Sequence, residues 1–265
     1  MSRLHFDYWM EISFTEPVVD CHYTIKCLPK DSDMQKISDL DIRVFPENAF
    51  QMGEDSFGNR TIYGNVKEQH TTFGFQVSGI AETWMSCGDF LKEEEYAGRF
   101  SYPYGLNKSG AGLSEYFASI DLTEADSAYD KGLLLMNSLH QEFNYEKEIT
   151  NVNTTAEEAW TLKKGVCQDY AHILIALCHK AGIPARYVTG MMIGEGYSHA
   201  WVEILSDGVW YGLDPTNGCI AGSSYIKIGA GRDANDCVIN KGIIRGGGMQ
   251  TQEVKVLVEE IPAEV

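Results

Sequence analysis

Hydrophobic and polar residues alternate along the first ~85 residues, a period typical of half-buried strands. The clearest strands are 22–29 and 39–46, each ending in a proline, and 71–84. Between them, 54–60 contains a Gly-Asn turn that leads into another short strand. Short strands at regular spacing predict a small all-β domain, built as a sandwich or a barrel.

The pattern becomes helical after Trp84. Residues 126–146 carry apolar side chains at helical spacing. Residues 153–165 predict a second helix, because Thr154 followed by Glu157 forms a capping-box pattern. We expect Gly165 to end that helix.

A third helix is expected to start near Val166 and to end at Gly182, with Pro184 beyond it. Three strands follow the helix, and an alternating segment near the C-terminus predicts a last one. These segments are 185–194, 198–205, 209–214 and 253–261.

The order of strands, then helices, then strands predicts an α+β fold. A segment rich in Gly, Ser and Pro at 98–112 separates the two kinds of pattern, as domain linkers do. We therefore expect an N-terminal β domain at 1–100 and a core at 101–265, which includes a closing C-terminal strand.

Composition narrows the possible functions. The chain has 265 residues, of which 44% are hydrophobic and 22% are charged, as in soluble globular proteins. Its net charge of −17 argues against nucleic-acid binding through a basic surface. No apolar run approaches a membrane span or a secretory signal, so we expect no membrane association.

The seven cysteines are scattered, and no two form a CxxC pair. An odd number without such pairs argues against a disulfide framework or a zinc ribbon. Together with the missing secretory signal, this pattern predicts a cytoplasmic protein.

Cys167 is the cysteine best placed to react. It follows Gly165 at a predicted helix start, where free N–H groups and the helix dipole favour the thiolate. The Cys167 N–H is itself one of these unpaired donors, so it can stabilise an oxyanion.

His199 and Asp214 can complete a catalytic arrangement. His199 and Trp201 share one strand face, so the imidazole can reach the helix start while the indole shields it from water. Asp214 ends the next strand, within reach of the imidazole. The three residues then serve as nucleophile, base and orienting group. Each alone is better explained as structural, but their combined placement favours chemistry.

The segments GVCQDYAHILIALCHKAGIPARYVTG, SHAWVEI and GVWYGLDPTNG resemble the core of the transglutaminase-like superfamily. The chain is similar to the bacterial transglutaminase-like proteins described as cysteine proteases, which carry a small β domain before the core. The resemblance implies a papain-like core, in which the nucleophile helix packs on an antiparallel sheet. It also implies Cys167 as nucleophile, His199 as general base and acid, and Asp214 as orienting residue, without a metal or another cofactor.

The second oxyanion donor does not transfer from that family, because Trp160 lies only seven residues before the cysteine on the preceding helix. By residue type the candidates for oxyanion or substrate binding are Gln141, Asn144, Tyr145 and Trp201.

Other polar groups are expected to be structural. Cys178 lies among apolar residues and should pack in the core. The spacing of Cys167, His172 and His179 does not suit a helical metal pair, so no metal site is expected. Arg186 is expected to pair with a carboxylate, and 231–237 to form a loop.

The predicted activity is cysteine-dependent acyl transfer on amides through a thioester acyl-enzyme. Peptide or amide hydrolysis is the first choice, because water is the default acceptor. Glutamine deamidation and amine transfer remain open, as does a non-catalytic binding module on the same fold. The expected partners are a peptide or protein substrate and, for transfer, an amine acceptor.

Overall fold

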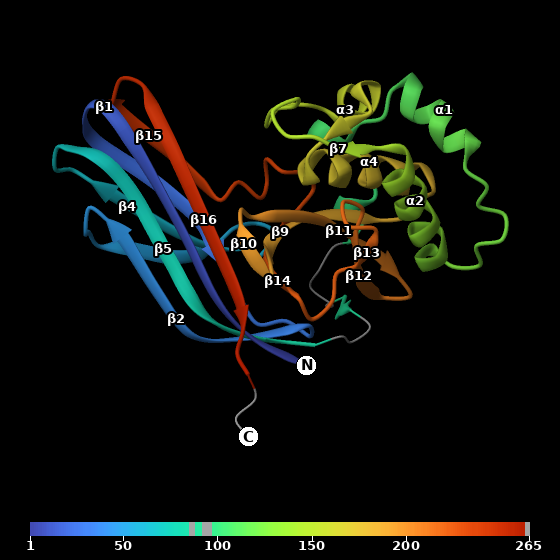
Figure 1. The fold of residues 1–265 in the computed structure, drawn as a ribbon, viewed down its shortest axis with the longest axis horizontal. Coiled ribbons are helices and arrows are strands. Elements are labelled where there is room, and N and C mark those ends of the chain that lie inside the picture. The colour runs from blue at the N-terminus through green and yellow to red at the C-terminus, as the bar shows by residue number, and fades with distance from the viewer. Residues whose placement is uncertain (85–87, 92–96, 263–265) are drawn as a thin grey trace.

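A computed structural model describes residues 1–84, 88–91 and 97–262, so Cys87 lies outside the described residues. A large β-sheet forms one side of the molecule, and a smaller sheet covered by helices forms the other (Figure 1). The predicted α+β class is confirmed: an all-β region precedes a core in which a helix packs on an antiparallel sheet.

The large sheet is organised around one long strand, β1 (Ser2–Leu28). The first half of β1 pairs with β5 (His70–Thr83) and β16 (Gln250–Glu260), and its second half pairs with β4 (Arg60–Val66) and β15 (Asn240–Gly246). The sequence pattern identified only the second half of β1 as a strand. The register of β1 shifts between Val18 and Cys21, and this irregularity interrupts the alternation.

Shorter strands extend this sheet. β2 (Gln35–Phe45) pairs with β5, β3 (Phe50–Glu54) pairs with β4, and β10 (Gly194–Gly196) pairs with β16. The side chains of β1 that point inward form a buried core with their partners on these strands. They include Leu4, Phe6, Tyr8 and Met10.

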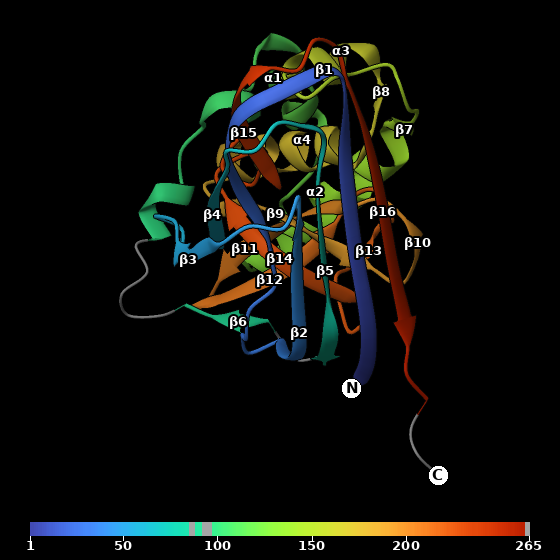
Figure 2. The ribbon, with the colours of Figure 1, turned by 90° about the vertical axis from the view of Figure 1, so that its left-hand side faces the viewer.

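The C-terminal strand belongs to the same sheet. β16 covers most of the predicted strand 253–261, but it pairs with β1 from Phe14↔Gln250 to Leu4↔Glu260. β1 therefore starts, and β16 ends, at the same end of the sheet (Figure 2). The predicted division instead assigns this strand to the core at 101–265. Alternation indicates which side chains face inward, but it does not indicate which strand is the partner.

The smaller sheet is antiparallel, and the three predicted strands of the core lie at its centre. Its order is β13 (Cys219–Ile220), β12 (Val209–Asp214), β11 (His199–Ser206), β9 (Ala185–Met192) and β14 (Tyr225–Gly231), with β6 (Asp89–Phe90) also paired to β12.

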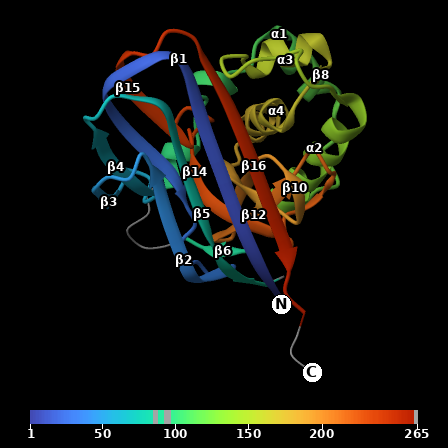
Figure 3. The ribbon, with the colours of Figure 1, turned by 60° about the vertical axis from the view of Figure 1, so that its left-hand side comes forward.

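Helices cover one face of this sheet, away from the long strands (Figure 1, Figure 3). They are α1 (Ala111–Ser119), α2 (Ala128–Glu142), α3 (Ala156–Leu162) and α4 (Cys167–Lys180), with the 3₁₀ turns η1 (Ala97–Phe100) and η2 (Gly105–Asn107) before them. α4 packs on β9 and β11, and its side chains from Ile173 to Cys178 are almost completely buried. The fold thus holds α4 rigidly above the start of β11.

The helix α3 begins one residue later than predicted. Thr155 caps it and exchanges hydrogen bonds with Glu158, whereas the Thr154 hydroxyl accepts from Asn151 N. Glu157 instead accepts from the backbone N–H groups at the start of α1. The same pattern of Thr and Glu fits both registers, and only the contact with α1 selects between them.

The prediction that Gly165 ends α3 is wrong. The helix ends earlier, because Lys163 already adopts the left-handed conformation that terminates it. Gly165 lies in β8 (Lys164–Gly165), where a Cβ atom would come within 2.4 Å of the Asp169 carboxylate. The glycine is therefore required by packing beside the next helix.

Candidate active site

Cys167 is the first residue of α4 and is partly exposed. As a first-turn residue, its N–H has no acceptor within the helix. The carboxylate of Asp169 accepts hydrogen bonds from Val166 N at 2.8 Å and from the Thr150 hydroxyl at 2.6 Å. These contacts anchor the helix start, so the thiol is held in place at the end of a buried helix.

His199 starts β11, and Asp214 ends the antiparallel neighbour β12, so the two residues lie at the same end of the strand pair. The His199 Nε2 atom lies 2.7 Å from Asp214 Oδ2. Cys167 lies close enough to His199 to raise the pKa of the imidazole. Because Nε2 faces the carboxylate, Nδ1 is the ring nitrogen left for the thiol. The fold therefore brings His199 and Asp214 into direct contact, with Cys167 close by at the start of α4.

Asp214 is fully buried and accepts hydrogen bonds on both oxygens. Oδ1 accepts from the backbone N–H groups of Thr216 at 2.9 Å and Asn217 at 3.2 Å. In addition to His199, Oδ2 accepts from the Asn217 amide at 2.7 Å and the Tyr225 hydroxyl at 2.8 Å. Burial opposes ionisation, but His199 and these donors hold the pKa of Asp214 below its ordinary value.

The contact between His199 and Asp214 shifts the pKa of His199 upward, in the direction opposite to that of Asp214. Burial favours the neutral ring, but hydrogen bonds and charges from Asp214 and Cys167 outweigh it and raise the pKa of His199 to about 10. The imidazole is therefore protonated at neutral pH.

Trp201 and Tyr145 lie beside this group. Trp201 is buried, and its ring lies nearly parallel to His199 with the ring centres 6.4 Å apart. Tyr145 is half-exposed on β7 (Asn144–Tyr145) and pairs with Gly165, two residues before Cys167. Burial, and to a lesser extent the nearby Cys167, raises the pKa of Tyr145.

The other two oxyanion candidates lie on β7 and α2. The amide of Asn144 is exposed and lies 3.5 Å from the Lys163 carbonyl. Gln141 is exposed on α2. Trp160 is buried in the helical core and stacks on Tyr116, with the ring centres 3.9 Å apart.

Sequence reasoning missed Asn217 and Tyr225, which together donate three of the hydrogen bonds to Asp214. Asn217 had a local signal, because an Asp that accepts from the backbone two and three residues later is a common turn. Tyr225 had no such signal, since it reaches Asp214 from a different strand.

Several groups are structural, as predicted. Cys178 is completely buried, and burial raises the pKa of its thiol to about 12. Arg186 pairs with Glu203 at 2.6 Å. His172 is buried and accepts from Ala234 N at 3.2 Å, and burial lowers its pKa to about 3.

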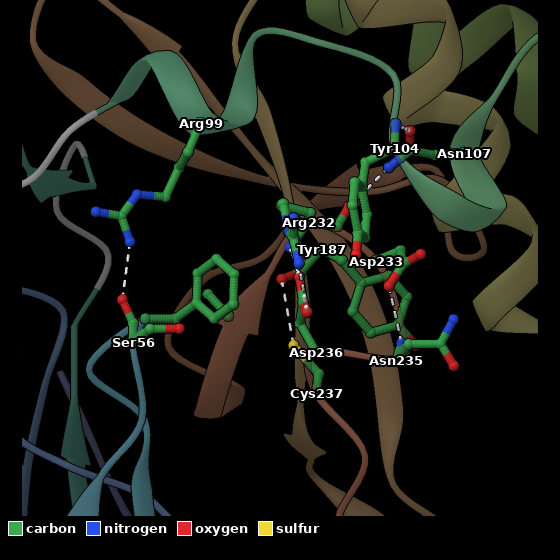
Figure 4. A network of polar contacts seen from close by, with 12 residues as sticks. Ser56, Arg99, Tyr104, Asn107, Tyr187, Arg232, Asp233, Asn235, Asp236 and Cys237 are labelled. Atoms are coloured by element: carbon green, nitrogen blue, oxygen red, sulfur yellow. Dashed lines mark hydrogen bonds and ion pairs between the residues drawn. The ribbon is translucent and has the colours of Figure 1, made fainter.

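The predicted loop is confirmed for 232–237, whereas Gly231 is the last residue of β14, and the loop anchors the segment before α1 (Figure 4). Arg232 pairs with Asp236 at 2.8 Å and lies over the Tyr104 ring. Asp233 is fully buried and accepts from Leu106 N at 3.0 Å. The loop thus joins the linker to the core.

Within the described ranges, no three His, Cys, Asp or Glu side chains come together in a way that would suit a metal ion. None of the helices in the described part of the chain combines the length and apolar character that a membrane crossing requires.

Comparisons with known proteins agree with this architecture. Residues 115–215 match the family model of the transglutaminase-like superfamily, and residues 4–82 match that of the bacterial transglutaminase-like N-terminal region. The two matched regions correspond to the helical core with its central strands and to the β-rich region before it.

Curated relatives are uncharacterized proteins. One from Mycobacterium leprae is 37% identical over 123 residues, which are 43% of this chain and 44% of that protein. Another, from Mycobacterium tuberculosis, is 27% identical over 79% of this chain and 76% of its own length.

Among solved structures, one of "a Putative Cysteine Protease" from Cytophaga hutchinsonii superimposes with a TM-score of 0.81. It covers 100% of this chain and 92% of that one at 20% identity, so the likeness concerns the fold.

Proposed function

We propose that this chain, which joins a bacterial transglutaminase-like N-terminal region to a transglutaminase-like core, is a cysteine-dependent enzyme that cleaves amide bonds in peptides or proteins. The observation that carries the proposal is the placement of His199, whose Nε2 atom lies 2.7 Å from the buried Asp214 and whose ring lies beside Cys167 at a helix start. A solely structural histidine has no need of this arrangement.

In the first half-reaction, the Cys167 thiolate attacks the carbonyl carbon of the amide, and the carbonyl oxygen takes the negative charge. The Cys167 N–H is placed to donate to that oxygen. His199 gives its proton to the amide nitrogen, the C–N bond breaks and the amine leaves. A thioester on Cys167 and a neutral His199 remain.

In the second half-reaction, water attacks the thioester while neutral His199 takes its proton. The C–S bond breaks, the carboxylic acid product leaves, and Cys167 is again a thiolate beside a protonated His199. Asp214 keeps the ring oriented throughout and stabilises its positive charge.

Hydrolysis, glutamine deamidation and amine transfer share this acyl-enzyme and differ in the substrate carbonyl and the acceptor. We favour hydrolysis because water is always present and because Cys167 is partly exposed to it. Transfer requires in addition a site that holds an amine against the thioester.

Thiol reactivity tests whether the site is catalytic at all. Iodoacetamide near neutral pH should label Cys167 much faster than Cys219, which is also partly exposed and is the matched comparison. His199→Ala should slow the labelling of Cys167, whereas His22→Ala, an exposed change on β1 in the large sheet, should not. Equal labelling of the two cysteines in the wild type would refute the proposal and favour a binding module.

Product analysis then separates the reactions. The wild type and Cys167→Ala are incubated with a mixed library of peptides and glutamine donors, with a primary amine present. Mass spectrometry distinguishes cleaved peptides, deamidated glutamine and amine adducts. Cleavage that depends on Cys167 supports hydrolysis, whereas adducts without cleavage would overturn it in favour of transfer.

A further inference from the structure

β14 connects the candidate active site to the N-terminal sheet. It is the edge strand of the smaller sheet and pairs with β9 on one side. Its side chains alternate between the two halves of the molecule: Ile226 and Ile228 lie in the core of the large sheet, whereas Tyr225 faces Asp214. One strand therefore belongs to both packing units.

The free edge of β14 is held by side chains from the large sheet. Gln35 at the start of β2 accepts from Lys227 N and donates to Lys227 O, both at 2.8 Å. Asn59, just before β4, makes the same two contacts with Ala230, also at 2.8 Å. Gln35 and Asn59 are almost completely buried, so these amides replace a neighbouring strand.

We call Gln35 and Asn59 together the clamp. Two further features support its hold on β14. The Thr83 hydroxyl at the end of β5 donates to Ser223 O at 2.5 Å, which holds the chain just before β14. A Cβ atom at Gly229 would lie 2.8 Å from the Asn59 side-chain oxygen, so the glycine lets the amide reach the strand.

Tyr225 is the residue of β14 that contacts Asp214 directly. Its hydroxyl donates to Asp214 Oδ2 at 2.8 Å and lies 3.4 Å from the Cys219 sulfur. Its ring packs edge-on against Trp201, with the ring centres 5.4 Å apart, and lies 6.2 Å from the His199 ring. Moving β14 would therefore move a donor of the same oxygen that orients His199.

We propose that Tyr225 is a positioning residue for the group Cys167, His199 and Asp214, and that the N-terminal β region sets its position by clamping β14. This inference rests on the proposed function. It gives the β region a role in the active site in addition to its own packing.

The first test removes only the hydroxyl. Tyr225→Phe should slow iodoacetamide labelling of Cys167 at neutral pH about tenfold, the size expected for one hydrogen bond to a charged group. The acid limb of the labelling profile should move to higher pH, because Asp214 with one donor fewer takes up a proton more readily. Tyr102→Phe, the same change at an exposed tyrosine, should alter neither.

The second test releases the clamp. Gln35→Leu should slow labelling about threefold, as expected when a strand loses part of its support, and should add nothing when combined with Tyr225→Phe. Gln76→Leu is the matched control, because Gln76 lies in the same sheet but donates to Asp7 at 2.7 Å. Thermal unfolding and circular dichroism verify that each variant is folded under the labelling conditions.

The outcomes distinguish the two proposals. If wild-type Cys167 labels no faster than Cys219, the proposed function is wrong. If wild-type Cys167 is fast and Tyr225→Phe keeps its rate and pH profile, the positioning role is wrong. Multiplying effects of Gln35→Leu and Tyr225→Phe would overturn the clamp, since the two would then act independently.

Discussion

Asp214→Asn is the sharpest test of the electrostatics of the site, because every group around Asp214 donates. Its Oδ1 accepts two backbone N–H groups and its Oδ2 accepts from His199, Asn217 and Tyr225. An asparagine offers one oxygen and one NH₂ group. Whichever way it turns, the NH₂ group faces donors, so buried hydrogen bonds are lost.

The expected cost follows from this geometry. The variant removes the negative charge to which these five groups donate, and it leaves donors without acceptors in a fully buried site. Breaking a buried charge pair in this way costs about 3–5 kcal/mol. For a chain of this length, that corresponds to a fall in Tm of roughly 10 °C at neutral pH.

The effect depends on pH with a defined sign. The pKa of His199 rises from 6.5 to about 10 on folding, so its stabilisation is complete below pH 6.5 and is lost as the pH rises through about 10. The pKa of Asp214 is lowered from 3.8, so its contribution is present above pH 3.8 and is lost as the pH falls through the folded value. The pair therefore stabilises the fold between these limits.

Thermal unfolding of the wild type and Asp214→Asn across pH 4 to pH 11 measures this window. The difference in Tm should be largest between about pH 4 and pH 6.5 and should shrink as the pH rises through about 10, above which His199 is neutral in both proteins. Labelling of Cys167 should slow in parallel at neutral pH. A difference in Tm that stays constant with pH, or no difference, would refute the reasoning.

Three further changes test parts of the structure outside the site. Glu157→Ala should destabilise the protein by about 1–2 kcal/mol in urea unfolding, because the start of α1 loses its acceptor; a change in unfolding slope alone would contradict this. Cys178→Ser should cost about 1–3 kcal/mol, since a hydroxyl enters an apolar site, yet leave Cys167 labelling unchanged. Glu203→Gln should cost about 3–5 kcal/mol, because Glu203 is the buried carboxylate that pairs with both Arg186 and Lys227; unchanged urea stability would exclude that role.

Much of the site could be predicted because its residues stand at positions marked by local pattern. Cys167 begins a helix, His199 begins a strand and Asp214 ends one, and helix and strand boundaries follow from spacing and from glycine and proline. Their proximity required only that a helix pack on two neighbouring strands, as the resemblance implied.

The support of the site could not be predicted in the same way. Tyr225 donates to a residue eleven positions away across a turn, and Gln35 binds a strand 192 residues later. In the sequence, neither residue is distinguishable from an ordinary polar or aromatic residue. Its hydrogen-bond partner depends on how distant segments of the chain pack.

By itself, the sequence determined the kinds of elements, the faces that they bury and the position of Cys167, His199 and Asp214 at the ends of elements, since periodicity and helix ends are local properties of the chain. Only the tertiary structure decided that β16 pairs with β1, that Glu157 caps α1, and that Tyr225 and Gln35 connect the β region to Asp214. Strand alternation and capping patterns allow several partners, and the choice among them depends on which buried polar groups of the whole fold find hydrogen bonds.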